Sequence, residues 1–193
     1  MRRAAALLCA ALAAGCITAQ PPAEPRYFSP GLPQVSPGDP ARAADGPLLR
    51  VRRVRAAAHL RDRMVWRNGV EIGFYDLLRW TESPARFVQS ALEEELFERR
   101  GFRRSGASAV ASLSTNLEAF DELLGPAHEA AVALDVLLTD PQSGTLIDRT
   151  FEVRKPIAGE DPKDVADALG AALSEAVHEI GSAVAESLGA HPF

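Results

Sequence analysis

The chain has 193 residues, a net charge of −5 and only two cysteines, Cys9 and Cys16. Because both cysteines lie close to the N-terminus, the remainder of the chain cannot hold an internal disulfide bond. Beyond the apolar segment at the N-terminus, no stretch is apolar enough to span a bilayer, which excludes a protein with several transmembrane helices.

The N-terminal segment has the layout of a secretion signal. The basic start, Met1–Arg3, precedes an apolar run, Ala4–Ala14, that is too short to cross a bilayer. The string Leu12–Cys16, small residues leading into a cysteine, resembles the lipobox read by lipoprotein signal peptidase. A thioether to diacylglycerol needs a sulfur nucleophile, so we predict a signal peptide over residues 1–15 and lipidation of Cys16 with diacylglycerol and palmitate. The alternative is an ordinary secretory cut nearby, which leaves Cys16 as a free thiol.

The next segment is rich in proline. Residues 17–47 hold eight of the fourteen prolines in the chain, and proline disfavours both helix interiors and central strands. We therefore interpret residues 16–47 as a lipidated cysteine followed by a semi-rigid tether that lifts the folded part off a membrane. The aromatic pair Tyr27–Phe28 interrupts the tether and predicts a short edge strand.

The remaining residues, 48–193, have the length of one domain. Loose alternation of Leu49, Val51 and Val54 predicts a strand with a bulge near residues 52–53. Further along, the runs Met64–Arg67 and Val70–Phe74 flank Asn68–Gly69. This dipeptide accepts positive φ at both central positions of a turn, so it predicts a two-residue hairpin.

Two amphipathic helices follow, each opened by a capping residue and a proline. The first extends from Ser83–Pro84 to Gly101, and the second from Asp161–Pro162 to Gly189. Between them we expect three strands over residues 117–124, 130–138 and 145–153, the last two joined by a loop at 140–144. Each helix is apolar on one side only. The order of elements predicts an α/β (α+β) two-layer sandwich, with a mixed or antiparallel sheet and both helices on one face.

Several strings, in this order, resemble a known family. They are Arg26–Pro30, Leu60–Arg67, Arg79–Pro84 and Thr145–Phe151, followed by the alanine-rich last helix. Behind a lipobox, they are similar to the ABC-type transport auxiliary lipoproteins over most of the chain. One departure is the run Ala56–His59, which stands where the family pattern has a proline.

The resemblance implies a periplasm-facing accessory of an envelope transport system. Its implied partners are an ABC permease and ATPase and a substrate-binding protein of the mammalian-cell-entry type, and its implied cargo is lipid or another hydrophobic molecule. Ile17, rather than an aspartate, follows the expected lipidated cysteine, which predicts the outer membrane, with the inner membrane as the other possibility. The alternative function is a free-standing anchored carrier, which needs an apolar cavity of about 300 Å³ or more.

An enzyme is not predicted, because no catalytic or metal-binding pattern is present. The four histidines are scattered along the chain, at His59, His128, His178 and His191. His178 and Ser182 lie one helical turn apart, and Glu93–Glu95 supplies three acids in a row, but both patterns are typical of a solvated helix face. We expect no catalytic residues, no cofactor and no metal.

Two tryptophans, Trp66 and Trp80, are possible ligand-binding residues, since an indole ring can contact a lipid or a protein partner through its apolar face. Aromatic residues in strands and before a helix more often pack in a core or across a hairpin. We therefore predict a packing role for both.

The two halves of the domain carry opposite charge. Residues 50–104 hold thirteen arginines and eight acids, whereas residues 105–193 hold four basic residues and fifteen acids. An exported protein meets no nucleic acid, and no stacking aromatics accompany the arginines. They are interpreted as a polar sheet face or as a docking patch for an acidic surface or lipid headgroups. The asymmetry predicts docking or a homo-oligomer, unless the halves interleave and neutralise one another.

Overall fold

A computed structural model describes residues 23–32 and 46–189 of the chain. The strands are β1 (Arg26–Phe28), β2 (Leu48–Val51), β3 (Arg55–Ala56), β4 (Arg63–Asn68), β5 (Glu71–Trp80), β6 (Arg103–Arg104), β7 (Ala111–Leu123), β8 (Glu129–Asp140) and β9 (Gly144–Pro156). The helices are α2 (Pro84–Glu93), the π-helix η3 (Glu94–Arg99) that continues it, and α3 (Pro162–Ser187).

Strand β7 is the centre of a mixed sheet. One of its edges pairs antiparallel with β8, which pairs in turn with β9. Its other edge receives three strands in parallel, β2 and β3 along the first half and β4 along the second. Strand β5 then pairs antiparallel with β4, β1 pairs parallel with β5, and β6 pairs parallel with β2.

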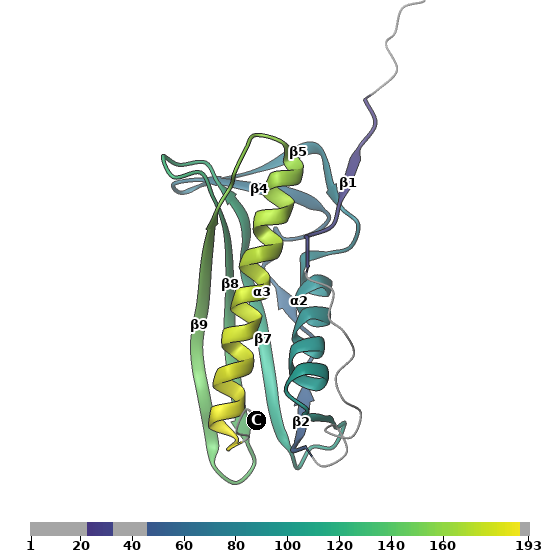
Figure 1. Ribbon diagram of the computed structural model, residues 1–193, viewed down its shortest axis with the longest axis vertical. Helices are drawn as coiled ribbons and strands as arrows, with labels where there is room; N and C mark the ends of the chain where they lie inside the picture. The colour runs from purple at the N-terminus through teal and green to yellow at the C-terminus, as the bar shows by residue number, and fades with distance from the viewer. Residues whose placement is uncertain (1–22, 33–45, 190–193) are drawn as a thin grey trace, which may run out of the picture.

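Both helices cover the same face of this sheet, so the fold is a two-layer α+β sandwich, as predicted (Figure 1). Side chains from the two layers fill the space between them. Leu113, Leu117 and Leu134 from the sheet are fully buried, as are Leu169 and Leu173 from α3. Burial of each such side chain contributes about 1.5–3 kcal/mol, which makes this interlayer core the main source of stability.

Several local predictions are confirmed. The aromatic pair at residues 27–28 lies in β1, an edge strand. The expected bulge near residues 52–53 is present, because Val51 pairs with Leu113 and Arg55 with Asn116, which leaves one extra residue on the β2–β3 side. Asp161 caps α3 by accepting a hydrogen bond from the Lys163 amide at 2.8 Å.

The hairpin between β4 and β5 forms, but its turn lies one residue later than predicted. Asn68 pairs with Glu71, so the two central residues are Gly69 and Val70, not Asn68 and Gly69. Only Gly69 has a positive φ, of 59°. Glycine at the first central position is the pattern of a type II′ turn, which needs positive φ at that position alone.

Other boundaries also differ. Strand β7 begins at Ala111, six residues before the expected start, and the two-residue strand β6 was not predicted. The first five residues of β7, ASLST, include only one large apolar side chain, so the sequence shows no clear alternation of apolar and polar residues there. In the structure, Leu113 and Thr115 are buried on the helix side, and the alternation of buried and partly exposed residues becomes apparent.

The residues after β1 pack onto the helix layer. Pro30 is buried, Leu32 contacts the core, and the backbone of Gly31 lies against Gly170 in the middle of α3. A β-carbon at Gly170 would lie 2.6 Å from the Gly31 amide nitrogen and 2.8 Å from its oxygen. Glycine at this position therefore lets the N-terminal segment reach the helix surface.

We expect Gly170→Val to destabilise the fold by about 1–3 kcal/mol, because the new side chain collides with backbone that cannot rotate away. Hydrogen exchange should show loss of protection at the Thr81 amide, which donates to the Phe28 carbonyl at 2.9 Å. The matched control is Ala171→Val, the same side chain at the next, exposed position of α3. Equal stability and equal Thr81 protection in the two variants would contradict the packing role of Gly170.

Candidate functional site

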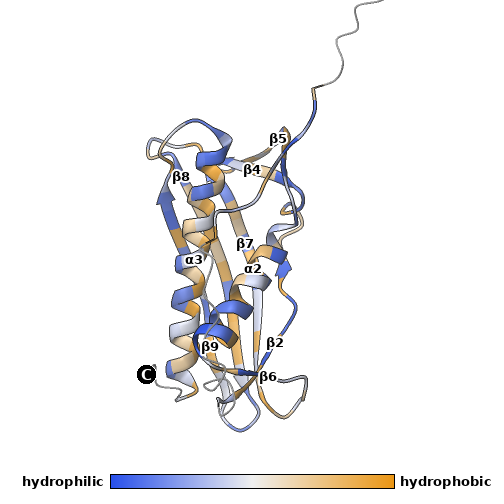
Figure 2. Ribbon diagram, turned by 45° about the vertical axis from the view of Figure 1, so that its right-hand side comes forward, coloured by the Kyte–Doolittle hydropathy of each residue, from blue (hydrophilic) through white to orange (hydrophobic). Residues whose placement is uncertain are grey.

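The face of the sheet that carries no helix is the main candidate surface. On β7, Ser112, Ser114 and Asn116 alternate with the buried leucines and point to this helix-free face. Their partners on β8 are Thr139, Leu137 and Asp135. In the view of Figure 2 both helices again lie on the other face of the sheet. The helix-free face is thus mostly small and polar, in line with a surface that meets water or a partner.

An arginine column borders this face. Arg50 pairs in register with Ser112 and Arg55 with Asn116, and between them the Arg52 amide donates to the Leu113 carbonyl. Arg52 and Arg55 are exposed, and within the described residues no ion pair involves any of these three side chains. Three unpaired cations along one strand edge form a positive strip suited to an acidic surface.

A shallow hollow of about 130 Å³ opens at the β4 end of the helix-free face. Three alanines line it, Ala119, Ala131 and Ala133, together with Arg67, Asp121, Leu123, Glu152 and Arg154. Its volume is well below the roughly 300 Å³ that a cavity for a small ligand requires. The hollow therefore fits a side chain of a docked partner better than a free ligand.

Asp121 is the most deeply buried charge of this region. Its side chain has no exposed surface, and Arg67 donates to its Oδ2 from Nε at 2.9 Å and from Nη2 at 2.7 Å. His59 Nε2 lies 4.0 Å from Oδ1 and has no hydrogen-bond partner. The pair ties the end of β4 to β7, so it fixes the β4–β5 hairpin to the sheet.

Glu122, the next residue, points to the opposite face. The Tyr75 hydroxyl donates to its Oε2 at 2.7 Å, and His128 Nε2 lies 2.7 Å from its Oε1. Burial, followed by the hydrogen bond and negative charge of Glu122, holds the pKa of the Tyr75 phenol well above its usual value. Tyr75 thus remains a hydrogen-bond donor at physiological pH.

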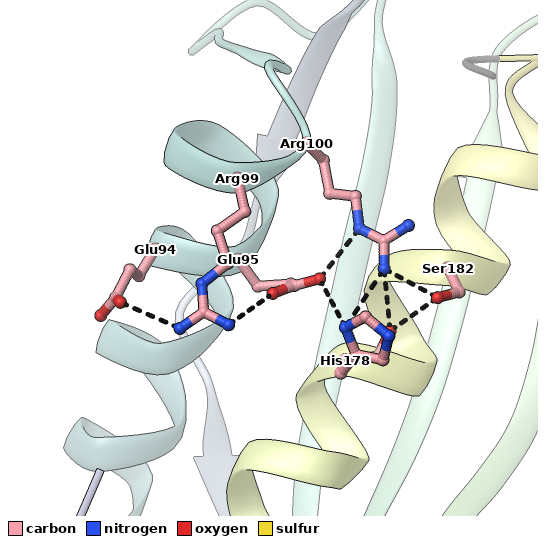
Figure 3. Close-up of polar contacts among 6 residues, drawn as sticks. All are labelled: Glu94, Glu95, Arg99, Arg100, His178 and Ser182. Atoms are coloured by element: carbon pink, nitrogen blue, oxygen red, sulfur yellow. Dashed lines mark hydrogen bonds and ion pairs between the residues drawn. The ribbon is translucent and has the colours of Figure 1, made fainter. Parts of the chain in front are cut away.

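The third polar cluster joins η3 to α3 (Figure 3). Glu95 is buried, and its Oε1 accepts from Arg100 Nε at 2.9 Å and lies 3.4 Å from His178 Nδ1. Arg100 Nη2 also donates to the Ser182 hydroxyl at 2.7 Å. The prediction that Glu93–Glu95 meets only water is therefore wrong: Glu95 is buried, Glu93 accepts hydrogen bonds from Gln89 and Arg104, and Glu94 pairs with Arg99.

This cluster has the wrong geometry for a catalytic pair. The Ser182 hydroxyl donates to the backbone carbonyl of His178 at 3.0 Å, not to its ring. Arg100 occupies the other side of the hydroxyl, so no general base is positioned to remove its proton. The arrangement is a structural contact between the two helices.

The other predicted residues are dispersed. His59, His128 and His178 each face a different carboxylate, and the described residues contain no group of three or more metal-ligating side chains. Cys16 and His191 lie outside the described residues. Both tryptophans have the predicted packing role: Trp80 is buried and packs edge-to-face against Phe87 and Phe120, and the Trp66 ring lies over Gly73, its partner across the hairpin.

No helix in the described part of the chain is both long and apolar enough to cross a membrane. A model of the ABC-type transport auxiliary lipoprotein component matches residues 31–181, most of the chain. The chain belongs to this family. It is a family of transport auxiliary lipoproteins and not a known family of enzymes. No curated protein matches the sequence of this auxiliary lipoprotein.

Solved structures share the fold of this auxiliary lipoprotein. A Xanthomonas campestris protein of the DUF330 family superposes with a TM-score of 0.71 at 20% identity, covering 85% of this chain and 97% of the other. A second structure, of an uncharacterized protein, superposes with a TM-score of 0.67 at 15% identity, covering 84% of this chain and 99% of the other. At such identities the likeness establishes the sandwich fold and no function.

The charge of the arginine-rich half could be recognised from the sequence, but the burial of Glu95 was not predicted. The available signal was its spacing, since Glu95 follows Leu92 by three residues and therefore falls on the apolar side of the first helix. A second signal was the glycine at position 181 of the last helix, which leaves room for a neighbouring side chain. In the structure, a β-carbon added at Gly181 would lie 2.7 Å from the Glu95 side chain. An acid on an apolar stripe needs a partner, and Arg100 supplies it.

Glu93, beside this cluster, gives the auxiliary lipoprotein a predicted pH dependence. Burial opposes ionisation, but the hydrogen bonds from Arg104 and Gln89 outweigh it and lower the pKa of Glu93 below its usual value of 4.5. A carboxyl group whose pKa is lower in the folded state stabilises the fold at any pH above its unfolded-state pKa. This stabilisation is lost as the pH falls through the folded-state pKa.

We therefore expect Glu93→Gln to lower the free energy of unfolding at pH 7 and to match the wild type at an acidic pH below the lowered pKa of Glu93. Urea unfolding at both pH values measures this convergence. Glu98→Gln, at an exposed residue of the π-helix that continues α2, is the control and should show no pH-dependent difference. A constant deficit of Glu93→Gln at every pH would refute the electrostatic explanation.

Proposed function

We propose that the protein is a lipid-anchored, periplasm-facing adaptor that docks onto the proteins of an ABC or mammalian-cell-entry type transport system. The observation that carries this proposal is the combination of the family match with the unpaired arginine column on the helix-free face. An adaptor needs an exposed recognition surface, and this face supplies a positive strip of defined spacing. The cargo moved by the partners is proposed to be lipid or another hydrophobic molecule.

The membrane part of the proposal rests on Cys16. Its thioether to diacylglycerol, with palmitate among the acyl chains, would hold the signal-cleaved chain on the outer membrane, and residues 16–47 would act as the tether. Part of that segment, β1 and the residues up to Leu32, packs on the described part of residues 48–193, which we propose to be the functional domain.

The alternative of a free-standing lipid carrier fits the structure less well. Side chains of the two layers are almost wholly buried against one another, and the hollow of about 130 Å³ lies on the outer face of the sheet. A carrier requires about 300 Å³ or more of apolar cavity. The packed interior supports an interaction module.

We expect reversal of the arginine column to abolish docking. In-cell cross-linking of the full-length chain, followed by mass spectrometry, should recover an ABC permease or ATPase and a protein with a mammalian-cell-entry domain. Arg52→Glu with Arg55→Glu should reduce this recovery by about fivefold or more, since like charges then meet at the interface.

The control for docking is Arg86→Glu, which reverses an exposed arginine on the helix side of the sandwich. It should leave recovery unchanged. Equal recovery with the column variant and with Arg86→Glu would refute docking through the helix-free face, and recovery of no transport component from the wild type would refute the adaptor function itself.

A further inference from the structure

Five of the seven exposed large apolar side chains in the described part of the chain lie at one end of the molecule, the others being Leu48 and Leu137. Val70, at the turn of the β4–β5 hairpin, is fully exposed, and Ile72 and Leu124 are each 37% exposed. Tyr27 on β1 and Leu77 on β5 are also exposed and belong to strands at the same end (Figure 1). Isolated exposed apolar residues are normal, but their concentration at one end requires an explanation.

The first three of these residues, here called the apolar tip, lie on neighbouring segments around Arg67. Ile72 pairs with Arg67 across the hairpin, and the Leu124 amide donates to the Arg67 carbonyl at 2.8 Å from the other side. Three chain segments therefore lie side by side, with Val70 at the projecting turn.

The tether enters the fold at the same end. In Figure 1, β1 and the β4–β5 hairpin lie at the same end of the molecule, although β1 pairs with the half of β5 remote from the hairpin turn, with Arg26 opposite Leu78. Arg26 is the tenth residue after Cys16, and an extended chain of ten residue steps spans at most about 36 Å. A lipid on Cys16 would thus keep this end within a short distance of the bilayer surface.

We propose that the apolar tip, Val70, Ile72 and Leu124, inserts into the interfacial layer of the bilayer that holds the lipid anchor. The inference rests on the proposed lipidation of Cys16. Three side chains do not bind a membrane durably on their own, but an anchored domain meets the bilayer continually, so the tip orients the domain. The arginine column, along the half of β7 that pairs with β2 and β3, then lies at the end of the sheet remote from the membrane, where a partner can reach it.

The test places a fluorophore at the tip and at a matched position on the far end. Val70→Cys and Leu48→Cys each introduce a thiol, while Cys16 is acylated and Cys9 has left with the signal. Leu48, an exposed residue of β2, lies at the opposite end. The lipidated proteins are labelled with an environment-sensitive dye and reconstituted into vesicles of phosphatidylethanolamine and phosphatidylglycerol that contain nitroxide-bearing lipid.

We expect nitroxide quenching of the Val70→Cys label to exceed that of the Leu48→Cys label by about twofold or more. Leu137→Cys, on the helix-free face, should resemble Leu48→Cys. Equal quenching at all three positions, in protein that floats with the vesicles, would overturn the proposed insertion while leaving the anchor intact. Protein that fails to float with the vesicles would overturn the anchor, and with it the inference.

Discussion

Replacing Cys16 by serine is expected to remove the protein from the membrane fraction almost completely. A serine hydroxyl cannot form the thioether to diacylglycerol, so neither the acyl chains nor cleavage by lipoprotein signal peptidase follows. Each buried methylene contributes about 0.8 kcal/mol to membrane binding, and two or three acyl chains make that binding effectively permanent. The measurement is fractionation of cells expressing Cys16→Ser, together with the N-terminal sequence and intact mass of the product.

The matched control is Cys9→Ser, the same substitution within the signal segment, which should leave anchoring unchanged. Membrane-bound Cys16→Ser protein with the wild-type N-terminus would refute lipidation. Separation of wild-type membranes on a density gradient tests at the same time whether the protein resides in the outer or the inner membrane. Co-migration with inner-membrane markers would refute the outer-membrane assignment while leaving the anchor untouched.

The sandwich could be predicted from sequence because its elements carry local signals. Capping pairs such as Asp161–Pro162 mark helix starts by their own chemistry, and alternating apolar residues mark strands wherever one face is buried. The hairpin turn was misplaced by one residue because Asn-Gly and Gly-Val are both acceptable turn centres. Only the pairing of Asn68 with Glu71, a contact across the hairpin, selects the second.

The arrangement of the sheet was less accessible. β2, β3 and β4 all add in parallel to one edge of β7, and each of these pairings joins residues more than fifty positions apart. No local pattern encodes such a pairing. The arginine column could consequently be recognised as charge in the sequence, but its position beside the small polar residues of β7 required the fold.

The burial of charged side chains was the feature least predictable from the sequence. Asp121 and Glu122 are adjacent acids near the end of a strand, which ordinarily indicates solvent, yet both are buried on opposite faces. Their partners, Arg67 and Tyr75, come from the β4–β5 hairpin. An acid that is buried in the fold cannot be identified until the distant cation or hydroxyl that neutralises it is known.

The Arg67–Asp121 pair gives the second large predicted effect. Arg67→Met keeps most of the aliphatic side chain but leaves the buried Asp121 carboxylate without its cation. Since an uncompensated buried charge is costly, we expect a loss of about 3–5 kcal/mol in the free energy of unfolding. Urea denaturation of the domain measures this loss, and it should be accompanied by faster hydrogen exchange at the Leu124 amide, which bonds to Arg67.

Arg154→Met is the matched control, because Arg154 lines the same hollow but pairs with Glu152 where both side chains are about half exposed. A surface pair of this kind contributes about 0–1 kcal/mol, so the control should cost far less than Arg67→Met. Adding Asp121→Leu to Arg67→Met should restore most of the lost stability, since it removes the buried charge itself. If the double variant is no more stable than Arg67→Met, the loss comes from packing at β4 and not from the unpaired carboxylate. Restoration would instead show that the loss in Arg67→Met comes from the buried Asp121 carboxylate left without a cation.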